Sequence, residues 1–275
     1  MKLSLSVRVA ESFSDKTRAT MGFEALAGLA KEVGYRAVCM RASQAGVQTP
    51  AERLREMRGT LDGMGLTVSM VTGDFAIPQN SEQGPGALRD IGPHLDVAEA
   101  FGATLIRVCM KRDEDVVWAQ RAADEARERG IRLAHQCHTA SLFETVEGAL
   151  DALRRVGRPN FGLIYEPANL DLCGQDYGPE TIRRFAPHLF NVYVQNHRRR
   201  PGGQSAVRTW VQGEVRVDLI RLQDGGGIGF SGVFEGLRAV GYDGYVTVHQ
   251  AFAGLLGAEE AARQSYEYLA SLLAS

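Results

Sequence analysis

The sequence has only four cysteines in 275 residues, and no two of them have the CxxC spacing of a zinc ribbon or redox motif. A disulfide scaffold is therefore not expected, and reduced thiols typical of a cytoplasmic protein are predicted at Cys39, Cys109, Cys137 and Cys173. Long apolar runs are also missing, at the N-terminus and elsewhere. We therefore predict neither an export signal nor a membrane anchor.

An excess of charge of either sign is absent as well. Lys and Arg number 31 and Asp and Glu 33, for a formal net charge of -2, which gives no electrostatic footprint for nucleic acid or a membrane surface. With 44% hydrophobic residues, the composition is that of a globular protein with a large core. A small-molecule substrate is the expected partner.

A short apolar strand, a polar loop and an amphipathic helix recur along the whole chain. Strands are predicted at Leu3–Val9, Ala37–Arg41, Leu66–Val71, Thr104–Met110, within 131–138, and at Phe161–Tyr165, Leu189–Gln195 and Tyr245–His249. Helices are predicted at Met21–Val33, from Thr49-Pro50 to Gly65, and at Ala87–Phe101, Asp113–Arg129, Leu142–Val156, Pro179–Phe185, Ser231–Val240 and Ala258–Leu273. Eight such units favour an α/β fold, a single-domain (β/α)8 TIM barrel over residues 1–275. An open doubly wound sheet is disfavoured, because no GxGxxG loop follows the first strand.

One connection is longer than the others. It runs from His197 to Gly229, and a loop of that length in a compact domain is usually functional or mobile. It contains the triplet Arg198-Arg199-Arg200, which is either a solvated loop or a clamp for a phosphate or carboxylate.

The fifth strand, within Ile131–His138, carries the most informative side chains. Because side chains alternate along a strand, Gln136 and His138 share one face, and His135 and Cys137 share the other. We predict that the first pair faces the barrel mouth, where active sites are built, and that the second pair packs against helices. A following helix start is predicted from the capping-box spacing of Ser141 and Glu144.

Three segments, in this order and spacing, carry a resemblance that covers essentially the whole chain. They are Pro159-Asn-Phe-Gly-Leu-Ile-Tyr-Glu-Pro-Ala-Asn169, Gly225-Gly-Gly-Ile-Gly-Phe230 and Gly241-Tyr-Asp-Gly-Tyr-Val-Thr-Val-His249. The sequence resembles the xylose isomerase-like TIM barrels, the superfamily of sugar phosphate isomerases and epimerases that also includes the endonuclease IV fold.

The resemblance implies a divalent metal ion, Mn, Zn, Fe or Mg, at the barrel mouth. Its ligands would be Gln136, Glu166, Gln195 and His249. Three of the usual ligand positions are substituted here, and only Glu166 is certainly anionic, whereas hard ions prefer several carboxylates. A site that binds no metal ion is therefore the alternative interpretation.

The resemblance also implies roles for the remaining side chains of the mouth. The implied catalytic residues are His138, His249 and Glu166, and the implied substrate-binding residues are Arg107, Asn169, Tyr193 and His197. Arg107 is either a substrate-orienting cation or a bridge between barrel layers. Imidazole moves protons near neutral pH, so His138 is the expected proton carrier, whereas an amide such as Gln136 cannot replace a lost base.

The function implied is that of a metal-assisted sugar isomerase or epimerase, of cytoplasmic carbohydrate metabolism, acting on a small polyhydroxylated or keto-sugar-like substrate. A lyase or dehydratase that performs an elimination is the alternative. Loss of the carboxylate pair also leaves open a non-catalytic sugar-binding barrel or a subunit of a larger enzyme. Self-association into a homo-oligomer is compatible with each of these.

Overall fold

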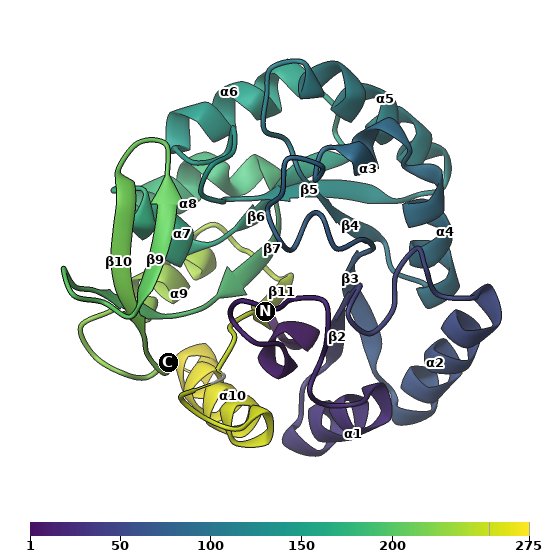
Figure 1. Cartoon of the computed structure of the whole chain (residues 1–275), viewed down its shortest axis with the longest axis horizontal. Helices are drawn as coiled ribbons and strands as arrows, with labels where there is room; N and C mark the ends of the chain where they lie inside the picture. Colours follow the sequence, from purple (N-terminus) through teal and green to yellow (C-terminus); the bar gives the residue numbers. More distant parts are fainter. Residues whose placement is uncertain (253, 275) are drawn as a thin grey trace.

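The computed structural model describes residues 1–252 and 254–274, and its centre is a closed barrel of eight parallel strands (Figure 1). The barrel order is β1-β11-β7-β6-β5-β4-β3-β2, so the first and last barrel strands close it. The strands are β1 (Lys2–Ser6), β2 (Ala37–Arg41), β3 (Thr67–Thr72), β4 (Leu105–Val108), β5 (Arg132–Gln136), β6 (Phe161–Tyr165), β7 (Leu189–Val194) and β11 (Tyr245–Val248). The predicted single-domain (β/α)8 barrel is confirmed.

Helices surround the barrel, and several of them end at the glycines that the sequence indicates. Gly34 and Gly65 follow helices in the left-handed conformation, with φ of 110° and 68°, which glycine adopts without a steric cost. The longer helices are α1 (Phe23–Val33), α2 (Ala51–Met64), α4 (Gly92–Phe101), α5 (Asp115–Glu128), α6 (Val146–Val156), α9 (Phe230–Ala239) and α10 (Ala258–Ala274). The shorter ones are α3 (Gly86–Arg89), α7 (Pro167–Leu172) and α8 (Pro179–Phe185). Within the described ranges, none is long and apolar enough to cross a membrane.

Three predicted boundaries are wrong. The first strand ends at Ser6 rather than Val9, because the Ser6 hydroxyl accepts a hydrogen bond from the Arg8 amide and starts a 3-10 turn. The helix predicted at 87–101 is two helices, since Pro93 favours a helix start over a helix interior. The helix predicted from Leu142 begins at Val146, where the Thr145 hydroxyl accepts from the Gly148 amide.

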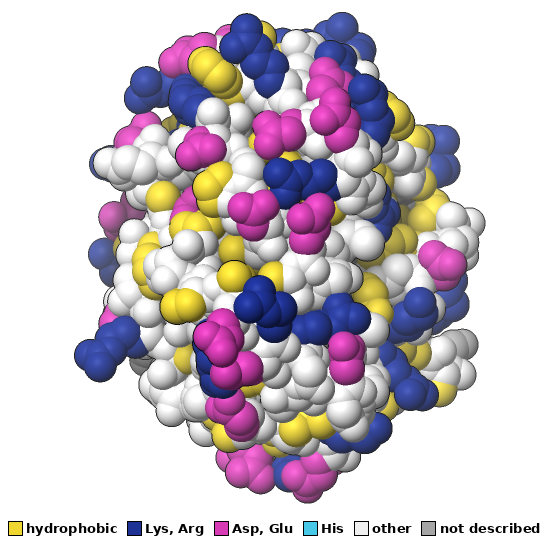
Figure 2. All heavy atoms as spheres, turned by 90° about the vertical axis from the view of Figure 1, so that its right-hand side faces the viewer, with side chains coloured by type: hydrophobic (Ala, Val, Ile, Leu, Met, Phe, Trp, Pro, Cys, Tyr) yellow, Lys and Arg dark blue, Asp and Glu magenta, His cyan; other side chains and the backbone are white. Residues whose placement is uncertain are grey.

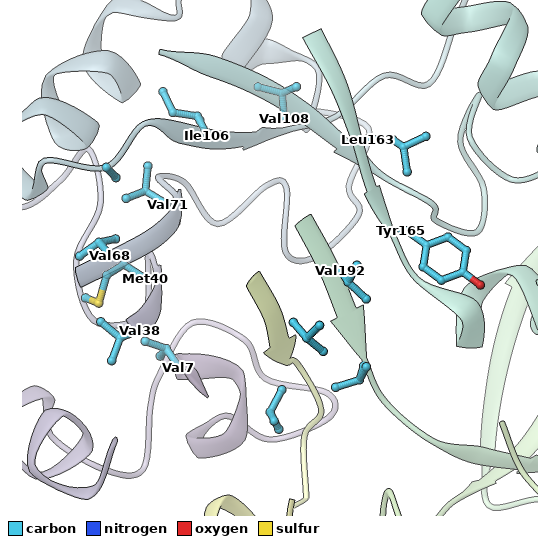
Figure 3. Close-up of a cluster of buried hydrophobic side chains, with 14 of the residues drawn as sticks. Val7, Val38, Met40, Val68, Val71, Ile106, Val108, Leu163, Tyr165 and Val192 are labelled. Atoms are coloured by element: carbon cyan, nitrogen blue, oxygen red, sulfur yellow. The ribbon is translucent and has the colours of Figure 1, made fainter. Parts of the chain in front are cut away.

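The core has two layers that follow from strand alternation. Inside the barrel lie Cys39, Met70, Leu105, Ala134, Ile164 and Tyr193. The neighbours of these residues along each strand point outward and pack against the helices; Figure 3 shows Ile106 and Val108 of β4 and Leu163 and Tyr165 of β6 in this outer layer. Both faces of every strand are therefore buried, as expected of a parallel sheet.

The long connection after β7 forms a second sheet, which the sequence did not predict. Its antiparallel strands are β8 (His197–Arg199), β9 (Ser205–Thr209) and β10 (Gly213–Leu219), at the left of Figure 1. The Trp210 amide at the β9–β10 turn donates to both Glu144 carboxylate oxygens, at 2.7 and 2.9 Å. Glu144 is thus a tether for this sheet rather than part of a capping box.

Asn196 fixes the other end of this connection. Its buried side chain donates to the carbonyls of Arg221, Leu222 and Asp224 and accepts from the Ile228 amide. A Cβ atom at Gly227 would collide with this side chain, which explains why a glycine is required at that position.

The outer surface is held by ion pairs between helices. Figure 2 shows the side that α2, α4 and α5 cover, where basic and acidic side chains are intermixed. At the end of α5, for example, Arg129 pairs with Asp96 at 2.7 Å and with Glu99 at 3.3 Å. Exposed pairs of this kind each contribute at most about 1 kcal/mol.

Candidate active site

A pocket of about 690 Å³, open to solvent, lies at the carboxyl ends of the barrel strands. The carboxyl ends of the strands are where TIM barrels bind their small-molecule ligands. Its polar and charged lining residues are Arg8, Lys16, Arg41, Arg107, Gln136, His138, Thr139, Asn169, Gln195, His197 and His249. Its apolar lining residues are Phe13, Pro78, Leu172, Val207, Val217 and Leu219, of which the last three belong to β9 and β10.

The floor of the pocket is an amide and carboxylate cluster. Gln136 at the end of β5 donates from Nε2 to Glu166 Oε2, and Asn169 Nδ2 donates to the same oxygen at 2.9 Å. The carboxylate is fully buried, and burial raises the pKa of Glu166 to about 7, although the hydrogen bond from Gln136 acts to lower it. Glu166 Oε1 and Gln136 Oε1 are buried and have no hydrogen-bond partner among the residues that the structure describes.

His138 presents a free ring nitrogen to the pocket. Its Nδ1 donates to the Thr139 carbonyl at 2.9 Å, which leaves Nε2 as the acceptor, and no residue that the structure describes hydrogen-bonds to Nε2. Burial, followed by the positive charge of Arg107, holds the pKa of His138 well below its usual range. The imidazole is therefore neutral at neutral pH and can accept a proton.

His249 is more tightly enclosed. Its Nδ1 lies 3.1 Å from the Ser6 hydroxyl, its Nε2 lies 3.5 Å from Arg41 Nη1, and its ring stacks on Tyr193 at 3.7 Å between centroids. Burial and the nearby arginines lower the pKa of His249 well below its usual value. Tyr193 itself lies in the barrel core, where its hydroxyl is hydrogen-bonded to Cys39 Sγ.

Two arginines at the ends of β1 and β2 share one buried carboxylate. Arg41 bonds to Glu11 through Nε at 2.9 Å and forms an ion pair at 2.9 Å through Nη2, and Arg8 lies 3.3 Å from the same carboxylate. All three side chains are almost completely buried. Burial and repulsion by Arg41 lower the pKa of Arg8 to about 10.

Arg107 and Lys16 form no ion pair with any acidic residue that the structure describes. Arg107 at the mouth of β4 is 4% exposed, and it makes no hydrogen bond or ion pair with any residue in the described ranges; its guanidinium lies 6.0 Å from the Tyr193 ring centroid. Lys16 Nζ donates only to the Pro78 carbonyl, at 2.8 Å. Burial and the three arginines lower the pKa of Lys16 to about 7.

The residues that the resemblance assigns to a divalent metal do not fit one. The oxygens of Gln136 and Glu166 that have no partner among the described residues are suitable metal ligands. Both ring nitrogens of His249, however, already have protein neighbours, since Nδ1 lies 3.1 Å from the Ser6 hydroxyl and Nε2 lies 3.5 Å from Arg41 Nη1. Glu166 is the only carboxylate of the set, among four cationic side chains that line the mouth. Within 1–252 and 254–274, no three His, Cys, Asp or Glu side chains form a metal-binding group. A dication prefers several carboxylate oxygens and a negative site.

The structure brings most of the predicted site residues together. Gln136, His138, Asn169, Gln195, His197, His249 and Arg107 line one pocket, and Glu166 lies directly behind its wall. Tyr193 does not reach the pocket. His135, which stacks on Phe143, and Cys137 belong to the outer core, as predicted.

Sequence reasoning missed Arg8, Lys16 and Arg41. Strand alternation could have found Arg41, which lies two residues after the inward-facing Cys39 and therefore on the same face. The Arg198-Arg199-Arg200 triplet lies outside the pocket lining, and Arg200 pairs with Asp218 at 2.7 Å.

The fold and the mouth pocket define a TIM barrel of the kind that houses small-molecule enzymes. The family model for the xylose isomerase-like TIM barrel matches residues 27–272, and this chain belongs to that family. No curated protein matches the sequence.

Solved structures agree in fold. The probable 3-DHS dehydratase AsbF from Bacillus anthracis shares 15% identity at a TM-score of 0.74, over 98% of this chain and 99% of that one. A xylose isomerase-like TIM barrel protein from Mycobacterium smegmatis, in complex with magnesium, shares 16% identity at a TM-score of 0.71, over 99% of this chain and 96% of that one. The D-allulose 3-epimerase from Methylomonas sp., in complex with D-allulose, shares 15% identity at a TM-score of 0.67, over 98% of this chain and 96% of that one.

Proposed function

We propose that this barrel is an enzyme that removes a proton next to the carbonyl group of a small polyhydroxylated or keto-sugar-like substrate. The observation that carries the proposal is the free Nε2 of His138, on a neutral imidazole inside the mouth pocket. Solved structures of the same fold include a named epimerase and a probable dehydratase.

In the proposed reaction, His138 Nε2 takes the proton and the electron pair of the C–H bond forms a carbon–carbon double bond. The carbonyl oxygen becomes an enolate oxygen. Delivery of that proton to the former carbonyl carbon, while the proton of the neighbouring hydroxyl passes to the enolate oxygen, completes an isomerisation. Alternatively, a hydroxyl group on the next carbon leaves as water with the proton held by His138, the carbonyl re-forms, and an elimination is complete. One base is sufficient for an isomerisation or elimination, which suits a site where an amide stands in place of a second carboxylate.

The negative charge of the enolate needs stabilisation, and the mouth supplies it. Arg41 and Arg107 line the same pocket as His138, and both are buried where the dielectric constant is low. Fixed positive groups in such a place stabilise developing negative charge without reorganisation. Since the predicted metal ligands do not fit a divalent ion, no step of this proposal passes through a metal.

Exchange of substrate hydrogen with solvent tests the proposal before the substrate is known. The protein is incubated in D2O with a panel of keto sugars and keto sugar acids, and deuterium at the carbon next to the carbonyl is measured by NMR. His138→Asn should abolish the exchange. His188→Asn is the matched control, because His188 lies outside the pocket lining.

Exchange that persists in His138→Asn would remove His138 as the base. Absence of exchange with every panel member, together with ligand-induced stabilisation, would favour a binding protein or an enzyme subunit instead.

A further inference from the structure

The pocket holds more positive charge than its reaction requires. Four cationic side chains, Arg8, Lys16, Arg41 and Arg107, line it, and two carboxylates, Glu11 and Glu166, lie against them. One enolate oxygen would balance one positive charge. Buried charges are normally paired, because the desolvation of an unpaired charge is unfavourable.

The excess is concentrated on two of the four cations. Glu11 engages both Arg8 and Arg41, and Ser43 also bonds to it at 2.5 Å. Arg107 and Lys16 retain donors that bond to no described residue, and both line the pocket. Burial lowers the pKa of Arg107, and Arg41 acts in the same direction, whereas Tyr193 and Glu166 oppose the shift.

From this arrangement we infer that the substrate carries its own oxyanion, a carboxylate or a phosphate, which binds between the Arg107 guanidinium and the Lys16 ammonium. The inference rests on the proposed function for the reacting end of the substrate and adds the chemical class of its other end. Guanidinium groups offer two parallel donors that match the spacing of carboxylate or phosphate oxygens. A polyhydroxylated acid or a sugar phosphate is therefore expected, rather than a neutral sugar.

The position of His138 agrees with this reading. The positive charge of Arg107 contributes to the low pKa of His138, so the two side chains act on the same region of the pocket. A bound oxyanion would offset part of that positive charge and increase the basicity of His138, since an opposite charge favours the protonated form.

Equilibrium binding tests the inference without turnover. The full chain is titrated by calorimetry at low salt and pH 6.5 with D-gluconate, D-glucose 6-phosphate, inorganic phosphate and D-glucose. Binding of at least one anion, with D-glucose bound more weakly or not at all, is the expected result. Arg107→Gln should lower the affinity for that anion about 10- to 100-fold, the loss expected when charge-assisted hydrogen bonds are removed. Arg263→Gln, on the exposed face of α10, should leave binding unchanged.

Each outcome of the titration either distinguishes a carboxylate ligand from a phosphate ligand or overturns the inference. Binding of D-gluconate alone indicates a carboxylate, and binding of the two phosphates alone indicates a phosphate. D-Glucose bound as tightly as the anions, or anion binding unaffected by Arg107→Gln, would overturn it. If Arg107→Gln does not fold, Lys16→Gln serves as the test variant with the same expected loss.

Failure of this inference and failure of the proposed function are distinguishable. Anion binding without solvent exchange would remove the reaction and keep the oxyanion site. Solvent exchange on neutral keto sugars without any anion binding would keep the reaction and remove the oxyanion site.

Discussion

Arg41 Nη1 lies 3.5 Å from Nε2 of His249, a residue that the family resemblance assigns to a metal ion. A guanidinium and a divalent cation cannot share that nitrogen, since one replaces the other. We therefore predict less than about a tenth of an equivalent of any divalent metal in protein purified without chelator. Elemental analysis by mass spectrometry measures it, and His249→Ala should not change the result. A stoichiometric metal that His249→Ala removes would contradict this prediction and restore the ligand set of the resemblance.

The role of His138 leads to a kinetic prediction. His138→Asn should lower kcat by at least about a hundredfold, the lower end for general acid and base catalysis, because asparagine cannot accept the proton. Steady-state kinetics on the substrate that shows exchange measures the effect. Anion affinity should stay within about twofold of wild type, since the Arg107 and Lys16 donors remain. An unchanged kcat would transfer the role to His249 or His197.

Lys16 should make anion binding depend on pH. Its pKa is lowered to about 7 by burial and by Arg8, Arg41 and Arg107, with Glu11 acting in the opposite direction. The ammonium is charged below pH 7 and loses its charge above it, so affinity for the anion should fall as pH rises through about 7. Lys16→Arg keeps its charge above pH 7 and should remove this fall. A wild-type affinity that is constant from pH 6 to 8.5 would show that Lys16 does not contact the anion.

Glu166 should reduce stability at alkaline pH. Its pKa of about 7 in the folded protein lies above the ordinary glutamate value of 4.5, so the folded state holds the proton longer than the unfolded state does. The free energy of unfolding therefore decreases as pH rises from about 4.5 to 7, by about 3 kcal/mol in total. Glu166→Gln should be the more stable protein at pH 8 and close to wild type at pH 4.5.

Urea denaturation of the two proteins at both pH values measures the difference. Glu235→Gln, an exposed substitution on α9, is the control for a lost carboxylate. Wild type that is more stable than Glu166→Gln at pH 8 would mean that the ionised carboxylate has a stabilising partner, such as a bound cation.

The barrel was predictable from sequence because its strands are buried on both faces. β2 and β6 were predicted with their observed bounds, since each is a short apolar run that ends at a polar or charged residue. The sheet of β8, β9 and β10 was not, because β8 has only three residues, two of which are exposed arginines, and β9 is largely exposed or half-buried. Its existence depends on distant contacts, above all the Trp210 amide with Glu144.

The candidate site divides in the same way. Alternation along β5 correctly separated Gln136 and His138 from His135 and Cys137. The cationic character of the mouth was not predicted, since the resemblance drew attention to metal ligands. Lys16 follows no strand pattern, and only the folded chain shows that the segment after Ala10 brings it to Pro78, 62 positions away in sequence.

The sheet built after β7 gives the pocket a cover with an origin different from that of its floor. Val207, Val217 and Leu219 contribute to the pocket from strands outside the barrel, whereas His138, Gln136 and Arg107 lie on barrel strands or directly after them. Substitutions in the cover can therefore change which substrates enter without disturbing the closed hydrogen-bond network that the barrel needs to fold. Ligand preference and the polar floor of the pocket can thus change at separate places in this molecule.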